Sequence, residues 1–270
     1  MYSLFCDTHT HTLYSRHAYS TIEENVNQAS QMAVPLLGST DHFSDMIYRP
    51  LSDPENLYDI RDFQYLMSTN IWPRSWKGVE LLHGVEADIV DLEGNLFGHD
   101  IYLKNAFYGD TFETPKSLQD LVFDNCDYVI ASVHKKDFAK GKTSVECTKA
   151  YLGALEQPKV LILGHIGRAG MPFDIDTVLL RAKELGKCIE VNEHTLRHYP
   201  EQSRLCRDIL VRAAELGCYI STGSDAHISV EVGDFRETTK LLSEIDFPRG
   251  LIATSSAEQF KKVMKQAFNQ

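Results

Sequence analysis

The chain has 270 residues, and its 27 lysines and arginines against 38 aspartates and glutamates give a formal net charge of −11. This balance disfavours a nucleic-acid partner bound through a basic patch, because neutralising phosphates needs clustered Lys and Arg. Hydrophobic residues make up 43% and charged residues 24%, as in an ordinary globular protein, which excludes disordered, collagen-like and low-complexity chains.

Neither a membrane partner nor secretion is indicated. No apolar run approaches the ~18 residues of a membrane span, and Asp7 interrupts the N-terminus before a signal-peptide core could form. We therefore expect a cytoplasmic protein. The six cysteines include no Cys-x-x-Cys pair, so we interpret them as reduced thiols rather than as a disulfide or metal framework.

Apolar, β-branched runs alternate along the chain with segments of helical period. The first helix is expected over residues 21–32, where Ser20 or Thr21 is followed three residues later by Glu23 or Glu24 in a capping-box pattern. The apolar runs predict seven strands, at residues 3–7, 35–40, 79–85, 126–133, 159–164, 187–191 and 218–223.

Repeated helix-then-strand units indicate a closed βα barrel of the α/β class. The residues before Gly186 and before Gly217 each predict a helix that is ended by the glycine and followed by a strand. Such units at irregular spacing fit the parallel strands of a barrel better than a solenoid with a fixed period. No Gly-, Ser- or Pro-rich linker divides the chain, so residues 1–270 are expected to form a single domain.

Residues 41–78 form the longest early stretch without a predicted strand. We interpret this stretch either as a lid over a site or as a helix with its own small core. Its aromatic residues are Tyr48, Tyr58, Tyr65, Trp72 and Trp76.

Six of the seven predicted strands run into side chains that can bind a metal. In a parallel barrel the C-terminal strand ends meet on one face, where active sites of this architecture lie. His9 and His11 form a His-x-His pair whose side chains should point to the same side of a strand and so chelate an ion. In chain order the candidate ligands are His9, His11, His17, His42, Glu86, His134, His165, Asp225 and His227.

Seven imidazoles and two carboxylates are too many for one catalytic zinc ion, which takes about three protein ligands. Two or three ions are therefore expected, with a carboxylate bridging at least one pair. Imidazole-rich ligation favours zinc, with manganese or iron as alternatives, over magnesium or calcium. The structural alternative is that each histidine is a satisfied core residue, but burying so many polar groups without partners would cost roughly 1–3 kcal/mol each.

Together these motifs resemble those of the PHP family, named for polymerase and histidinol phosphatase. The resemblance runs from residue 3 to about residue 227, with His-x-His first and Asp-x-His last. It is carried by the segments Asp7-Thr-His-Thr-His11, Thr40-Asp-His42, Gly84-Val-Glu86, Val133-His134, Gly164-His165 and Gly223-Ser-Asp-Ala-His227. The segments His17-Ala-Tyr-Ser20 and Ile71-Trp-Pro-Arg74 resemble the stand-alone bacterial zinc phosphatase branch of the family.

The resemblance implies a distorted (β/α)7 TIM-like barrel with a site for three divalent metal ions, and it implies a ligand set for each ion. Glu86 would bridge the first two ions. The first ion would be bound by His9, His11, Glu86 and Asp225, the second by Glu86, His134 and His165, and the third by His17, His42 and His227.

Such a cluster suits hydrolysis of a small phosphomonoester, because metal-bound hydroxide can attack while the ions bind phosphate oxygens. Asp41 is expected either to orient a ligand imidazole or to cap the next helix. Candidate phosphate cations are Arg74, Lys135, Arg168 and Arg197, and His194 and Arg197 are the first choices for substrate contact because both follow strand six.

Other functions stay open on sequence grounds. An amidohydrolase-like C-N hydrolase also begins with His-x-His but often needs a metal-bridging lysine in the middle of the chain. Within the PHP family, a histidinol-phosphate or phosphotyrosine phosphatase or a 3′ exonuclease is an alternative, although this chain shows no clear equivalent of the inserts usual in histidinol phosphatases. A structural metal module without enzyme activity is the remaining hypothesis.

Overall fold

Seven parallel strands form the barrel part of the main sheet, in the order β1-β2-β5-β8-β9-β10-β11. The computed structural model describes residues 5–46, 63–106, 111–135 and 137–269. Each of the seven predicted strands is found, and the first lies later in the chain than residues 3–7. The strands are β1 Asp7–Thr10, β2 Leu36–Ser39, β5 Val79–Asp88, β8 Tyr128–Ser132, β9 Val160–Leu163, β10 Cys188–Asn192 and β11 Tyr219–Gly223.

The first and last strands lie side by side, so the sheet is a nearly closed barrel. Thr10 forms a parallel bridge with Ala226 just beyond β11. The backbone N–H of Asp225 donates to His9 O at 2.8 Å, and that of His11 donates to Ala226 O at 3.0 Å. The α/β barrel expected from the sequence is therefore confirmed.

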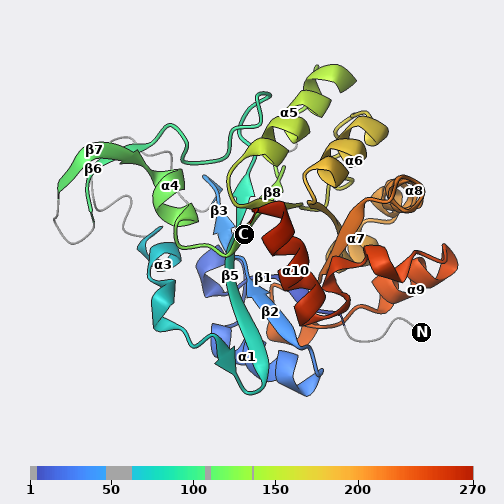
Figure 1. Cartoon of the computed structure of the whole chain (residues 1–270), viewed down its shortest axis with the longest axis horizontal. Coiled ribbons are helices and arrows are strands. Elements are labelled where there is room, and N and C mark those ends of the chain that lie inside the picture. The colour runs from blue at the N-terminus through green and yellow to red at the C-terminus, as the bar shows by residue number, and fades with distance from the viewer. Residues whose placement is uncertain (1–4, 47–62, 107–110, 136, 270) are drawn as a thin grey trace.

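Helices cover the outside of the barrel (Figure 1). The capping box before α1 is confirmed, with Thr21 as the N-cap and Glu24 three residues later. Gly186 and Gly217 follow their helices with φ of 66° and 75°, a backbone region that favours glycine. The helices are α1 Ile22–Gln31, α3 Gln64–Met67, α4 Leu118–Phe123, α5 Ser144–Glu156, α6 Ile175–Glu184, α7 Glu193–His198, α8 Pro200–Leu216, α9 Arg236–Glu244 and α10 Ala257–Ala267.

The C-terminal helix α10 packs against the N-terminal ends of the strands, opposite the end that carries the candidate ligands. Phe260 on α10 belongs to the same buried cluster as Leu36, Tyr128 and Cys188, which are the first residues of β2, β8 and β10. The rings of Phe260 and Tyr128 meet edge to face with centroids 5.5 Å apart. In Figure 1 this helix crosses the middle of the fold.

Residues 41–78 contain short strands that the sequence did not predict. β3 (His42–Phe43) and β4 (Ser75–Trp76) both pair with β5. Trp72 packs edge-on against the ring of His83 at a centroid distance of 5.4 Å. Tyr48 and Tyr58 lie outside the described residues, so the lid interpretation stays a prediction.

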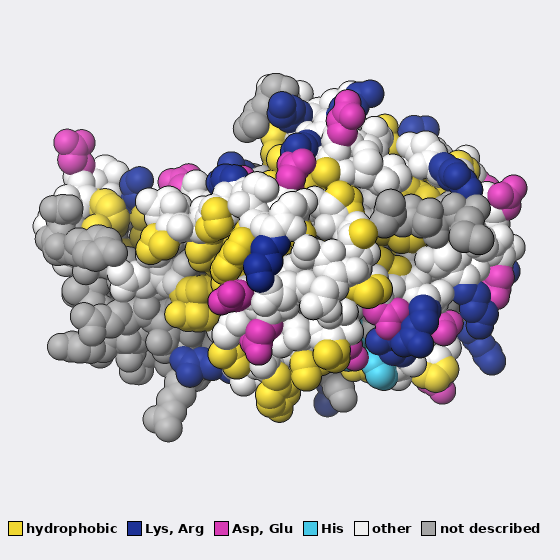
Figure 2. Space-filling view, turned by 90° about the horizontal axis from the view of Figure 1, so that it is seen from below, with side chains coloured by type: hydrophobic (Ala, Val, Ile, Leu, Met, Phe, Trp, Pro, Cys, Tyr) yellow, Lys and Arg dark blue, Asp and Glu magenta, His cyan; other side chains and the backbone are white. Residues whose placement is uncertain are grey.

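Away from the barrel, β6 (Tyr102–Asn105) and β7 (Thr111–Ser117) form a separate antiparallel pair at one side of the molecule (Figure 1). All six cysteines are free thiols. On the face in Figure 2, acidic and basic side chains are mixed rather than gathered into a basic strip among the coloured residues. In the described part of the chain, no helix combines the length and apolarity needed to cross a membrane.

We expect Phe260→Ala to destabilise the protein by about 3–5 kcal/mol, because it leaves a cavity beneath the barrel. Chemical denaturation monitored by circular dichroism measures the change. Lys262→Ala, on the exposed side of the same helix, is the control and should change stability by less than about 0.5 kcal/mol. Equal stabilities of the two variants would contradict the role of α10.

Candidate metal centre

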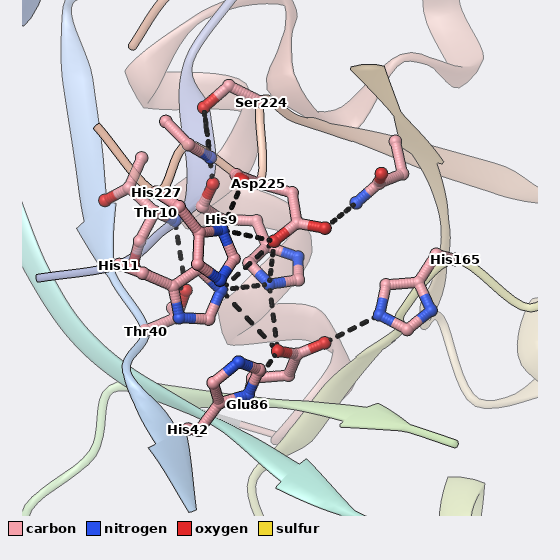
Figure 3. Close-up of polar contacts among 12 residues, drawn as sticks. His9, Thr10, His11, Thr40, His42, Glu86, His165, Ser224, Asp225 and His227 are labelled. Atoms are coloured by element: carbon pink, nitrogen blue, oxygen red, sulfur yellow. Dashed lines mark hydrogen bonds and ion pairs between the residues drawn. The ribbon is translucent and has the colours of Figure 1, made fainter. Parts of the chain in front are cut away.

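The side chains predicted as ligands gather at the C-terminal end of the barrel, where Figure 3 labels all of them except His17 and His134. His134 contacts Glu86, and His17 contacts His227. Three sets of three could each bind one ion, because one ligand atom from each member lies within 4.8 Å of the others. The sets are His9, His11 and Asp225; His42, Glu86 and His134; and His11, His42 and His227. The remaining two, His17 and His165, contact these sets directly. Coordination by the nine residues stays a prediction.

Glu86, on β5, lies at the centre of the cluster with its side chain fully buried. Its Oε1 is 2.8 Å from Nε2 of His165 and 3.2 Å from Nε2 of His134. Its Oε2 is 2.9 Å from Nδ1 of His42 and 3.3 Å from Nε2 of His9. One carboxylate oxygen therefore faces each side of the cluster, as a bridging ligand would require.

Asp225, just after β11, faces the His-x-His pair. Its Oδ1 is 3.2 Å from Nε2 of His11 and 3.6 Å from Nε2 of His9. The same-side placement of His9 and His11 is found, with their Nε2 atoms 3.1 Å apart.

His17, His42 and His227 form the outer edge of the cluster. Nε2 of His17 is 3.3 Å from Nε2 of His42 and 2.9 Å from Nε2 of His227. His17 is the most exposed of the three. This edge opens toward the cavity described below.

Hydrogen bonds on the far side of several rings leave Nε2 available to a metal. Nδ1 of His134 is 2.6 Å from Asp88 Oδ1, and Nδ1 of His227 is 2.9 Å from the backbone oxygen of Asp225. Nδ1 of His11 is 2.8 Å from Oγ of Ser15. A ring that donates through Nδ1 presents the Nε2 lone pair to its other side, which is the usual arrangement of metal-binding histidines.

The cluster contains buried polar atoms that no hydrogen bond satisfies. Among them are Glu86 Oε2, Asp225 Oδ1, His42 Nδ1 and His134 Nε2. Such atoms are costly in a protein interior unless an ion or water binds them. All four belong to predicted ligands and are of the nitrogen and oxygen types that zinc accepts. The residues therefore fit a metal site.

Charges within the cluster shift the pKa values of its members. Burial raises the pKa of Glu86 and of Asp225, but nearby cationic groups, chiefly His134 for Glu86 and Arg168 for Asp225, outweigh it and hold both pKa values well below their usual range. Burial lowers the pKa of His134, yet the carboxylates of Glu86 and Asp88 raise it to about 10. Both carboxylates are therefore in the charged form that metal coordination needs, and an ion bound at Nε2 of His134 would replace the proton there.

Three supporting residues were missed by the sequence analysis. Glu190 on β10 contacts His9, Asp88 at the end of β5 contacts His134, and Ser15 contacts His11. Charged residues inside otherwise apolar strands were the available signal for Glu190 and Asp88. Asp41 is expected from the sequence either to orient a ligand imidazole or to cap a helix, and the first role is favoured. Asp41 accepts a hydrogen bond at 2.7 Å from Oγ of Ser15, which in turn contacts the ring of His11.

A cavity of about 510 Å³ adjoins the outer edge of the cluster, a size suited to a small ligand. Arg168 and His194 line it. Arg197 does not line it and instead lies 3.2 Å from Glu193 and 3.0 Å from Asp234. Lys135 turns to Asp45 at 2.7 Å.

Comparison with known proteins shows to which family the chain belongs. The PHP domain matches residues 7–199. The chain belongs to the PHP family. A probable phosphatase of Caldanaerobacter subterraneus is 35% identical over 97% of this chain and 92% of its own length. Another from Clostridium acetobutylicum is 34% identical over 96% and 93%.

Solved structures share the fold of this PHP protein. Histidinol phosphate phosphatase of Lactococcus lactis, complexed with zinc, L-histidinol and phosphate, has a TM-score of 0.54 at 18% identity, covering 90% of this chain and 94% of that one. The putative histidinol phosphatase of Listeria monocytogenes has a TM-score of 0.56 at 18% identity, covering 86% and 98%. At this identity the likeness supports the fold alone.

We expect the purified PHP protein to bind about two or three divalent ions per chain, since the donor set exceeds one zinc site. Ions that bind only the folded protein stabilise it, by about 2.7 kcal/mol at 100 times the Kd. Metal analysis and thermal melting with and without a chelator measure both effects. Fewer than two ions per chain, or a chelator-insensitive Tm, would contradict the site.

Proposed function

We propose that this PHP protein is a metal-dependent phosphatase that hydrolyses small phosphomonoesters. The observation that carries the proposal is the convergence of seven imidazoles and the Asp225 carboxylate around Glu86, next to a cavity of about 510 Å³. The probable phosphatases that resemble the chain over nearly its whole length support the same class of reaction.

We propose the ligand sets that the family resemblance implies, although the nearest ligand atoms also bring His42 close to Glu86 and His134, and His11 close to His42 and His227. His9, His11, Asp225 and Glu86 would bind one ion, and Glu86, His134 and His165 a second. His17, His42 and His227 would bind the third. We propose zinc, with manganese or iron as alternatives, and these ions would supply an activated water and bind phosphate oxygens.

Arg168 is the arginine best placed to contact a phosphate. It lines the cavity, and its Nη1 lies 2.6 Å from Asp225 Oδ2, so the guanidinium lies directly beside the cluster. A guanidinium binds phosphate oxygens through several N–H groups in one plane. Arg197 does not line the cavity, which favours Arg168 for this role.

His194 is proposed as a second substrate contact. It lines the cavity, and its buried Nδ1 has no hydrogen-bond partner. Burial lowers its pKa to about 4, so the ring is neutral near pH 7. A neutral ring can donate a hydrogen bond to a phosphate oxygen or accept one from a substrate hydroxyl.

The C-N hydrolase alternative has less support. No lysine lines the cavity among the residues that the structure describes, and Lys135, the first of two lysines after β8, pairs with Asp45. Among the described residues, a metal-bridging lysine of the amidohydrolase kind is therefore not found at this strand end, and the neighbouring Lys136 lies outside those residues.

Glu86→Gln should lower kcat/KM for p-nitrophenyl phosphate by more than about 100-fold, because it removes a charge shared by two proposed ions. Zinc-loaded protein is assayed first with this substrate and then with a panel of phosphorylated metabolites. Glu80→Gln, on the same strand and paired with Lys261, is the control and should keep full activity. A metal-replete parent protein that hydrolyses no phosphomonoester would overturn the proposal.

Arg168→Met should raise KM and the inhibition constant for inorganic phosphate at least about tenfold, since a charge-assisted hydrogen bond contributes roughly 1.5–3 kcal/mol. Both constants are measured at saturating zinc, so that loss of the Asp225 contact does not reduce metal loading. Arg197→Met is the comparison and should change them less than about threefold. A larger increase of both constants in Arg197→Met than in Arg168→Met would assign the phosphate contact to Arg197.

A further inference from the structure

Glu190 is a buried carboxylate on β10, the strand whose end carries no predicted metal ligand. Its side chain is 1% exposed. Oε1 lies 2.6 Å from Nδ1 of His9, and Oε2 accepts hydrogen bonds from the backbone N–H of His165 at 2.8 Å and from Asn192 Nδ2 at 3.2 Å. One side chain thus contacts two proposed ligands that come from opposite parts of the chain.

The contact with His9 determines which ring nitrogen faces the cluster. A carboxylate only accepts, so the hydrogen on His9 Nδ1 points to Glu190 and the Nε2 lone pair points away from it. That Nε2 lies 3.3 Å from Glu86 Oε2 and 3.6 Å from Asp225 Oδ1. Glu190 therefore directs His9 toward the position proposed for the first ion.

The contact with His165 acts on the backbone. His165 has a φ of 28°, in a region that residues other than glycine seldom adopt, so surrounding contacts must hold it there. The hydrogen bond from its N–H to Glu190 is one such contact. In this conformation Nε2 of His165 lies 2.8 Å from Glu86 Oε1, at the position proposed for the second ion.

Gly223 on β11 provides the space that the carboxylate occupies. A Cβ at this residue would lie 2.3 Å from Oε1 of Glu190 and 2.5 Å from Cβ of His9. Any side chain there would displace Glu190, His9 or both. A substitution at Gly223 therefore disturbs the contact between Glu190 and His9 without removing the carboxylate of Glu190.

We propose that Glu190 is a positioning residue that sets the affinity of the first two metal positions together, by orienting the ring of His9 and the backbone of His165. The inference rests on the ligand sets given under the proposed function and not on the substrate. The third position, formed by His17, His42 and His227, has no contact with Glu190 and should be unaffected.

Zinc binding to Glu190→Gln tests the proposal directly. Competition with a chromophoric chelator, in the absence of substrate, counts the ions and measures their affinities. We expect the affinity of two ions to fall about 10- to 100-fold, the usual effect of losing a partner behind a metal ligand. Gly223→Ala keeps the charge and should lower the same two affinities. Because a side chain at residue 223 would also press on His9, the affinity of the second ion decides the question if Glu190→Gln does not fold.

Glu193→Gln is the matched control, because Glu193 is equally buried but its hydrogen-bond partners are Arg197 and the first N–H groups of α9. Glu193→Gln should lower the Tm of the metal-free protein and leave zinc affinity unchanged. Glu190→Gln should lower zinc affinity and leave the Tm of the metal-free protein unchanged. Parent-like zinc affinity in Glu190→Gln, or an equal loss in Glu193→Gln, would overturn the proposal. A parent protein that binds zinc but hydrolyses no phosphomonoester would contradict only the proposed function.

Discussion

The buried charge of Glu86 is the constraint on which the rest of the site depends. A fully buried carboxylate is costly unless positive charge lies beside it. Four imidazole nitrogens surround its two oxygens at 2.8 to 3.3 Å. Either protons on these rings or divalent ions between them must balance the carboxylate, and the unsatisfied atoms of the cluster favour ions.

The barrel supplies the rigidity that such a cluster needs. Parallel strands bring side chains that are distant in sequence to one face, and a ring of partners behind them fixes the direction of each imidazole. Asp88, Glu190 and the pair of Ser15 and Asp41 each hold a different ring. At the opposite end, α10 closes the barrel with an apolar cluster, so polar chemistry is confined to one side.

The acidic composition and a phosphate substrate are compatible in this arrangement. The net charge of −11 counts side chains only, and three divalent ions would add +6 at the mouth of the barrel. A small phosphate would then meet a local positive site beside Arg168, although the protein as a whole is acidic.

The sequence by itself determined the seven strands and the α/β barrel, and its motifs indicated the family by resemblance, because strand periodicity and short motifs are local properties. Only the tertiary structure decided which supporting residues meet the ligands. Glu190 lies on a strand with no ligand of its own. Its partner His165 follows the adjacent strand β9, whereas His9 on β1 reaches Glu190 only because the barrel closes. Arg197 follows β10 as expected, but one helical turn places it beside Glu193, so Arg168 lines the cavity instead. Such contacts depend on how separate elements pack, which local sequence patterns do not encode.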